Sequence, residues 1–146
     1  MKITLDAQTV TGLIDGEPPY LRQRMDQAEA RGATFHMSSL VLHDVALAAM
    51  TSEQAARKLA QLDAFLARVE VVAWTSEDAL TAARLRADRE KQVSGQSLWI
   101  DDAAQILHLA QALNNDWTVV TFTRTQAVVA PMPGLLTIDW SAPGDD

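Results

Sequence analysis

The sequence predicts a single α/β domain built on a mostly parallel sheet. Short apolar runs with strand character alternate along the chain with segments of helical spacing; the runs are residues 2–5, 34–38, 69–74, 117–122 and 135–140. Strands that alternate with helices favour a parallel sheet covered by helices on both faces. The chain has 146 residues, of which 48% are hydrophobic, so residues 1–146 can form one domain around a sizeable core.

The first half of the chain reads as two strand and helix pairs. KITL is an apolar strand that runs into Asp6 and a short helix, and YLRQRMDQAEARG has helical character. TFHMS then reads as a strand that leads into the helical segment SLVLHDVALAAM. The repeated switch between the two periods predicts the alternating order of elements.

Capping motifs place the next two helices. Thr51 and Gln54 have the spacing of a capping box and predict a helix that runs through AFLARV, followed by the strand VEVVAW. Thr75 and Asp78 repeat this spacing and predict a helix that continues to the basic segment ARLRADREK and is broken by Gly95.

The last predicted helix extends to Asn114 and has two distinct faces. One face carries the apolar stripe of Ile106, Leu109, Ala110 and Leu113, and the opposite face carries Asp101, Gln105, His108 and Ala112. His108 is therefore expected on the surface. Asp102 and Gln105 also fit a capping box, so an N-cap and a catalytic role both remain open for Asp102.

Composition excludes several classes of protein. The absence of cysteine rules out disulfides, thiolate metal sites and thiol nucleophiles. The net charge of −7 argues against binding nucleic acid through general basicity, although Arg22, Arg24 and the 84–91 cluster could act locally. The sequence shows neither a signal peptide nor an apolar run of about 18 residues, which predicts a soluble cytoplasmic protein with no membrane partner.

Two carboxylates stand out by position. Asp6 follows the first strand, at the edge where α/β sheets bind ligands, although it could also cap the next helix. Asp44 lies inside an apolar helical run, where a carboxylate is costly unless it is paired, bound to a ligand or directed into a cleft. Both residues are candidates for a functional site.

Several stretches resemble those of PIN-domain nucleases. ITLDAQTV is similar to the family's opening strand with Asp-Thr-Asn-Val, and MSSLVLHDV is similar to Ile-Ser-x-x-Thr-x-x-Glu-Leu, with Asp44 at the glutamate. QILHLAQALNNDWTVVTFTR matches Asp-Ala-Ile-His-Leu-Ala-Thr-Ala-Leu, a loop and Val-Thr-x-Asp without a gap, and PGLLTIDW fits the last strand. Among PIN proteins, the size and single-domain layout are most similar to the VapC toxins of bacterial toxin–antitoxin pairs.

The resemblance implies a three-layer α/β/α fold and metal-dependent hydrolysis of an RNA phosphodiester. It implies a site for Mg²⁺ or Mn²⁺ made by Asp6, Asp44 and Asp102, with Gln105 and Thr123 at the family's third and fourth acids. The implied partners are an RNA substrate, a cognate antitoxin and a second copy in a homodimer.

The neutral residues at two acidic positions leave two functions open. An amide oxygen can bind a cation but brings no charge, so Gln105 and Thr123 predict a weakened site, unless Asp101 or Asp102 supplies a ligand one turn earlier. The first function is a VapC-like endoribonuclease. The alternative is a PIN-like binding or regulatory module without catalysis.

Overall fold

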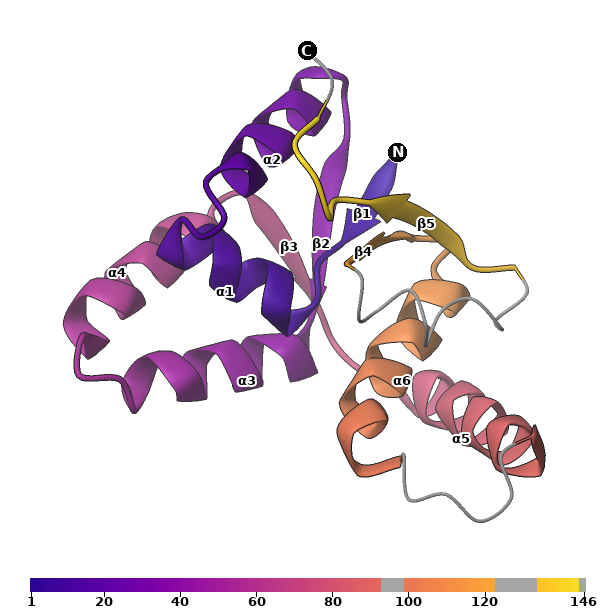
Figure 1. Ribbon diagram of the computed structural model, residues 1–146. Coiled ribbons are helices and arrows are strands. Elements are labelled where there is room, and N and C mark those ends of the chain that lie inside the picture. Colours follow the sequence, from indigo (N-terminus) through magenta and orange to yellow (C-terminus); the bar gives the residue numbers. More distant parts are fainter. Residues whose placement is uncertain (93–98, 123–133, 145–146) are drawn as a thin grey trace.

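Five parallel strands form one sheet in the order β3-β2-β1-β4-β5 (Figure 1). The computed structural model describes residues 1–92, 99–122 and 134–144, of which residues 89–92 and 99–104 are described by their backbone alone. The strands are β1 (Lys2–Thr4), β2 (Thr34–Ser38), β3 (Val69–Val72), β4 (Thr118–Thr121) and β5 (Leu136–Asp139). This all-parallel sheet confirms the predicted α/β class.

Helices form the other two layers of the fold. They are α1 (Ala7–Asp15), α2 (Tyr20–Ala30), α3 (Ser39–Met50), α4 (Ala55–Leu66), α5 (Ser76–Gln92) and α6 (Trp99–Asn114). Figure 1 shows α1 to α4 together on one side of the sheet and α5 with α6 on the other. The three-layer α/β/α arrangement predicted from the sequence is therefore confirmed.

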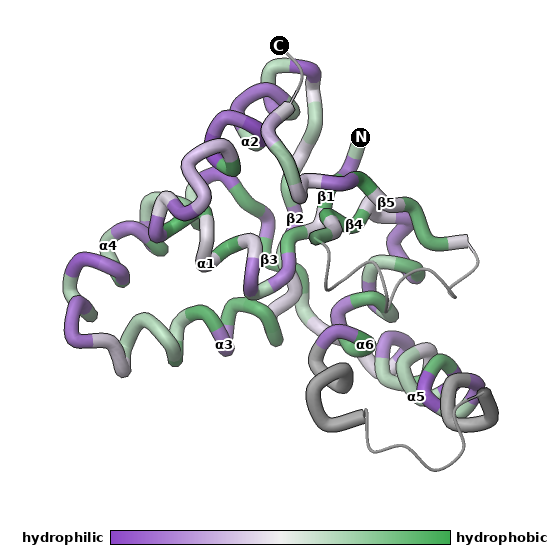
Figure 2. The backbone as a smooth tube through the Cα atoms, viewed as in Figure 1, coloured by the Kyte–Doolittle hydropathy of each residue, from purple (hydrophilic) through white to green (hydrophobic). Residues whose placement is uncertain are grey.

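The central strands are buried on both faces. On β4, Val120 packs into the larger core with residues of α1 to α4, whereas the adjacent Val119 packs with Leu109 of α6. Successive side chains of a strand point to opposite faces, so this division shows that both faces are covered. Figure 2 shows green residues between paler and purple ones along the central strands, and mainly purple along α2.

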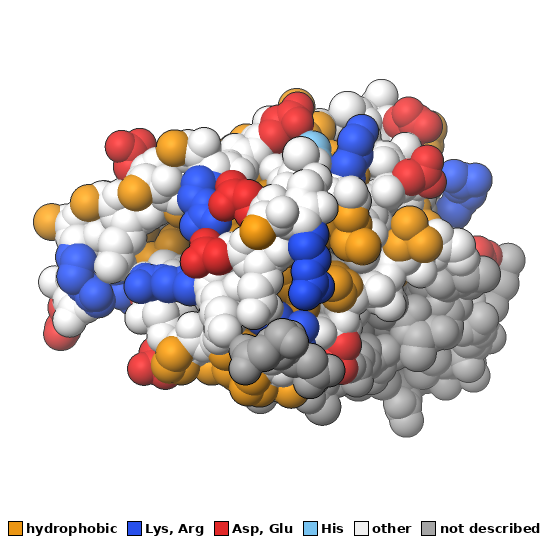
Figure 3. Space-filling view, turned by 90° about the horizontal axis from the view of Figure 1, so that it is seen from above, with side chains coloured by type: hydrophobic (Ala, Val, Ile, Leu, Met, Phe, Trp, Pro, Cys, Tyr) orange, Lys and Arg blue, Asp and Glu red, His pale blue; other side chains and the backbone are white. Residues whose placement is uncertain are grey.

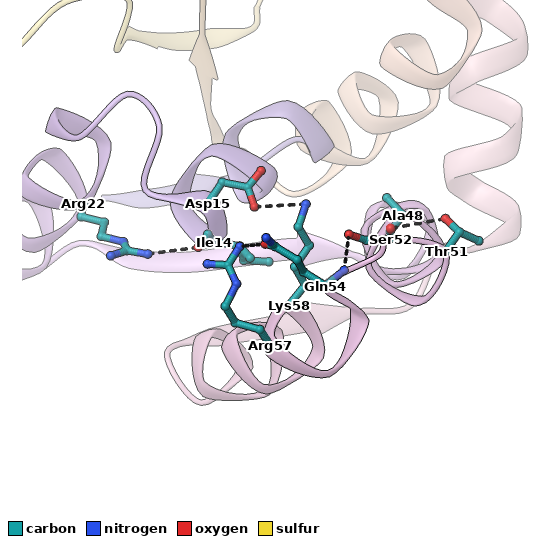
Figure 4. Close-up of polar contacts among 9 residues, drawn as sticks. All are labelled: Ile14, Asp15, Arg22, Ala48, Thr51, Ser52, Gln54, Arg57 and Lys58. Carbon is teal, nitrogen blue, oxygen red and sulfur yellow. Dashed lines mark hydrogen bonds and ion pairs between the residues drawn. The ribbon is translucent and has the colours of Figure 1, made fainter.

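Polar groups fix both ends of α1. The Asp6 side chain caps its first turn, and Gly16 ends it in the left-handed region with φ of 72°. Beyond that end, Arg22 of α2 donates a hydrogen bond to the carbonyl oxygen of Leu13 at 2.9 Å. It donates another to the carbonyl oxygen of Ile14 at 3.0 Å (Figure 4). A cation at the carboxyl end of a helix satisfies free carbonyls and complements the helix dipole.

The capping box predicted at Thr51 is wrong. The Thr51 hydroxyl donates to the carbonyl oxygen of Leu47 at 2.9 Å, so this residue ends α3 instead of starting α4. The backbone N–H of Gln54 donates to the Ser52 hydroxyl at 3.1 Å, and α4 begins only at Ala55 (Figure 4). A hydroxyl that can bond back to its own helix competes with the capping role.

The capping box at Thr75 is confirmed. The Thr75 N–H donates to an Asp78 carboxylate oxygen at 2.9 Å, and the Asp78 N–H donates to the Thr75 hydroxyl at 3.2 Å. The other oxygen of Asp78 accepts from the Asn114 amide at 2.9 Å. Asp78 therefore caps α5 and joins it to the end of α6.

We expect Asp78→Ala to lower the free energy of unfolding by about 1–3 kcal/mol, because it removes a cap and leaves the Asn114 amide without its carboxylate. Urea unfolding followed by circular dichroism measures this loss. The matched control is Asp88→Ala on the exposed face of the same helix, which should change stability by less than about 0.5 kcal/mol. Equal losses in the two variants would contradict the role of Asp78.

The last helix begins earlier than its capping motif suggested. α6 starts at Trp99, so Asp102 lies within its first turn and the N-cap interpretation of Asp102 is wrong. Among the described residues, no helix is both long and apolar enough to span a membrane.

Candidate functional site

Asp6 is a buried carboxylate at the carboxyl end of β1, with only 2% of its surface exposed. One carboxylate oxygen, Oδ1, accepts hydrogen bonds from the Thr9 N–H at 2.8 Å and from the Thr9 hydroxyl at 2.6 Å. The helix-capping role left open by the sequence is therefore real. Because only Oδ1 takes part in the cap, Oδ2 is left for a different partner.

That partner is Gln105, whose Nε2 donates to Asp6 Oδ2 at 3.2 Å. The contact joins α6 to the end of β1 across 99 residues of sequence. The other amide atom, Gln105 Oε1, is buried and has no hydrogen-bond partner among the described residues. Two of the residues predicted for the site thus lie together.

His108 is buried, and the prediction that it lies on the surface is wrong. It is 4% exposed, one turn after Gln105 on α6. Burial lowers the pKa of His108, and the nearby Asp6 carboxylate opposes this shift only in part. Its Nε2 atom is buried without a hydrogen-bond partner in the part of the chain that the structure describes.

Asp44 lies in the second turn of α3, which follows β2, the parallel neighbour of β1. Its side chain is 53% exposed and its Oδ1 lies 2.9 Å from Nδ1 of His43. The apolar sequence around Asp44 predicted a buried carboxylate. Instead, one side of α3 faces the solvent, and the apolar side chains of Leu47 and Met50 are exposed as well. A role for Asp44 as a metal ligand stays a prediction.

The remaining predicted site residues lie outside what can be described in full. Asp101 and Asp102 are placed by their backbone in the first turn of α6, and Thr123 falls outside the described residues. Among the residues whose side chains are described, no three of the His, Asp and Glu type are grouped to hold a metal ion.

Arg22 and Arg24, the cations that the sequence marked for a local role, both donate to main-chain carbonyl groups. Arg22 binds the carboxyl end of α1, whereas Asp6 caps the amino end of the same helix. Arg24 donates to the carbonyl oxygen of Ala142, near the end of the chain. On the face in Figure 3, basic side chains lie among acidic and apolar ones without forming one continuous patch.

The site therefore consists of the buried carboxylate of Asp6 and two polar side chains of α6 beside it, Gln105 and His108. Asp6 supplies the charge, and Thr9, which the sequence analysis did not single out, fixes its orientation. The Asp-x-x-Thr spacing at the start of a helix was the available signal for Thr9. Oε1 of Gln105, which has no hydrogen-bond partner in the described part of the chain, is a hard oxygen donor, so the donor chemistry beside Asp6 fits a divalent cation.

Solved structures share this fold. VapBC2 from Rickettsia felis, bound to a promoter DNA fragment, is 20% identical over 96% of this chain and 99% of that chain, with a TM-score of 0.78. DNA-bound VapBC from Salmonella typhimurium is 23% identical over 96% and 98%, with a TM-score of 0.77. FitAcB from Neisseria gonorrhoeae is 15% identical over 94% and 96%, with a TM-score of 0.66.

At these identities the likeness establishes the fold alone. A comparison with curated protein sequences finds no match. The PIN domain model, however, matches residues 3–130, which include Asp6, Asp44 and Gln105. The chain therefore belongs to the PIN domain family.

Proposed function

We propose that this chain is a VapC-like endoribonuclease, the toxin of a toxin–antitoxin pair, with a weakened metal site. The observation that carries the proposal is the buried Asp6 at the carboxyl end of β1, in contact with Gln105 of α6, within a PIN fold. The VapBC complexes among the solved structures support an antitoxin as partner. We also expect a homodimer that acts in the cytoplasm on an RNA substrate.

In this proposal, Asp6, Asp44 and Asp102 hold Mg²⁺ or Mn²⁺. A bound divalent ion lowers the pKa of the attacking water and offsets charge on the scissile phosphate. Asp6 provides a fixed anionic oxygen, because the two bonds from Thr9 hold its carboxylate in one orientation. Gln105 aligns the second oxygen of Asp6.

A second candidate is a PIN-like binding or regulatory module without catalysis. The hydrogen bond from Gln105 favours it, because an N–H directed at Asp6 satisfies the carboxylate without a cation. An acid at this position would instead repel Asp6 unless a cation lay between the two. The two candidates differ in whether the chain binds a divalent ion.

The Asp6→Asn variant tests the proposal, because asparagine retains an oxygen that can cap α1 but removes the charge. We expect its free energy of unfolding to stay within about 1 kcal/mol of the wild type, since the Gln105 amide can turn to accept from asparagine. Titration calorimetry should show that Mn²⁺ binding is lost, and cleavage of RNA should be lost with it.

The companion variant is Thr9→Ser, which keeps the hydroxyl that donates to Asp6 and should keep Mn²⁺ binding. Unchanged Mn²⁺ binding in Asp6→Asn would contradict Asp6 as a ligand. Absence of Mn²⁺ binding and cleavage in the folded wild type would favour the binding module.

A further inference from the structure

Two buried polar atoms lie on one face of α6, near Asp6. They are Oε1 of Gln105 and Nε2 of His108, which find no hydrogen-bond partner among the described residues. Residues three apart on a helix are neighbours on its surface, so both side chains belong to the same patch. An unsatisfied buried polar atom is destabilising, and two in one place indicate a common partner.

The surroundings limit what this partner can be. Asp6 is the carboxylate that acts electrostatically on His108, and its Oδ2 contacts Gln105. A second anion would meet the Asp6 charge in a buried place, which is unfavourable. A cation would gain from that charge and could be ligated by the carboxylate oxygen, the amide oxygen and the imidazole nitrogen.

Resting on the proposed function, we infer that His108 is a metal ligand of this site, with Asp6 and Gln105, and that the site prefers Mn²⁺ to Mg²⁺. Mg²⁺ demands hard oxygen ligands in near-ideal octahedral geometry, whereas an imidazole nitrogen suits transition metals. The nitrogen of His108 offsets the carboxylate that is lost where Gln105 replaces an acid. The neutral amide of Gln105 then turns to present its oxygen to the ion.

Pulsed electron paramagnetic resonance of the full-length protein loaded with Mn²⁺ tests this ligand directly, because it detects a nitrogen bound to the metal without relying on activity. The chain has three histidines, and the ring nitrogens of His36 lie beside Thr34 and Glu70, so the variants His108→Gln and His43→Gln separate the other two. We expect nitrogen coupling in the wild type and in His43→Gln, and none in His108→Gln. Coupling that is absent from the Mn²⁺-bound wild type, or that depends on His43, would overturn the inference.

Calorimetric titrations with Mn²⁺ and with Mg²⁺ test the preference. His108→Gln should weaken Mn²⁺ binding about 10-fold or more, and Mg²⁺ binding by less than about twofold. Gln111→Leu is the matched control, because Gln111 is buried on the same helix but donates to the carbonyl oxygens of Val72 and Ala73. Its Mn²⁺ affinity should equal that of the wild type.

The outcomes separate this inference from the proposed function. Mn²⁺ binding and RNA cleavage that need Asp6 but not His108 would overturn the role of His108 and leave the nuclease proposal in place. A folded protein that binds neither ion would overturn both. Equal weakening of Mn²⁺ binding in Gln111→Leu and His108→Gln would show a general effect on α6 and also overturn the inference.

Discussion

Replacing Gln105 and Thr123 together by aspartate is expected to raise the affinity for Mg²⁺ about 10- to 100-fold. The PIN resemblance places acids at both positions, and the wild-type chain has two fewer negative charges there. In the structure, Gln105 contacts Asp6, so an aspartate at 105 adds a carboxylate beside a buried one. Two neighbouring carboxylates repel each other until a cation binds between them. Titration calorimetry with Mg²⁺ measures the gain.

The controls decide between a weakened and a lost nuclease. Adding Asp6→Ala to the double variant should abolish the gain in Mg²⁺ binding. The wild-type chain, in contrast, should cleave RNA weakly or not at all. Strong Mg²⁺-dependent cleavage by the wild type, lost in Asp6→Ala, would contradict the weakened site and indicate that Asp101 or Asp102 supplies the missing ligand. No cleavage by either folded form would favour the binding module.

The fold could be predicted from the sequence because its signal is spread over the whole chain. Five apolar runs separated by helical segments predict a parallel sheet, and an error of a few residues at one boundary does not change that pattern. Boundaries depend on single side chains. Thr51 and Asp102 each matched a capping box, yet Thr51 ends α3 and α6 starts at Trp99.

The candidate site was only partly predictable, because helix faces depend on tertiary packing. Helical spacing assumes one buried and one exposed face, but α6 packs against α5 as well as β4, so His108 is buried opposite the predicted stripe. The prediction for α3 failed in the opposite direction. Its apolar composition predicted burial, but several of its apolar residues and Asp44 are exposed. Asp6 was predictable because its place depends on the order of strand and helix alone.

Trp140→Ala is expected to lower the free energy of unfolding by about 3–5 kcal/mol, which is the usual cost of removing a large buried aromatic side chain. Trp140 directly follows β5 and is 1% exposed, within the core shared with α1 to α4. Its backbone N–H donates to the carbonyl oxygen of Thr121 at 3.1 Å, and the substitution leaves this bond in place. Burial of the side chain in this core holds the end of the last strand against the domain.

Natural domains are stable by only about 5–15 kcal/mol, so this single change should remove a large part of the total. Urea unfolding followed by circular dichroism measures the loss without depending on tryptophan fluorescence. Trp140→Phe is the matched control: it keeps most of the buried apolar surface and should cost about half as much or less. A loss below about 1 kcal/mol in Trp140→Ala would mean that the cavity collapses or that the segment after β5 contributes little to the core.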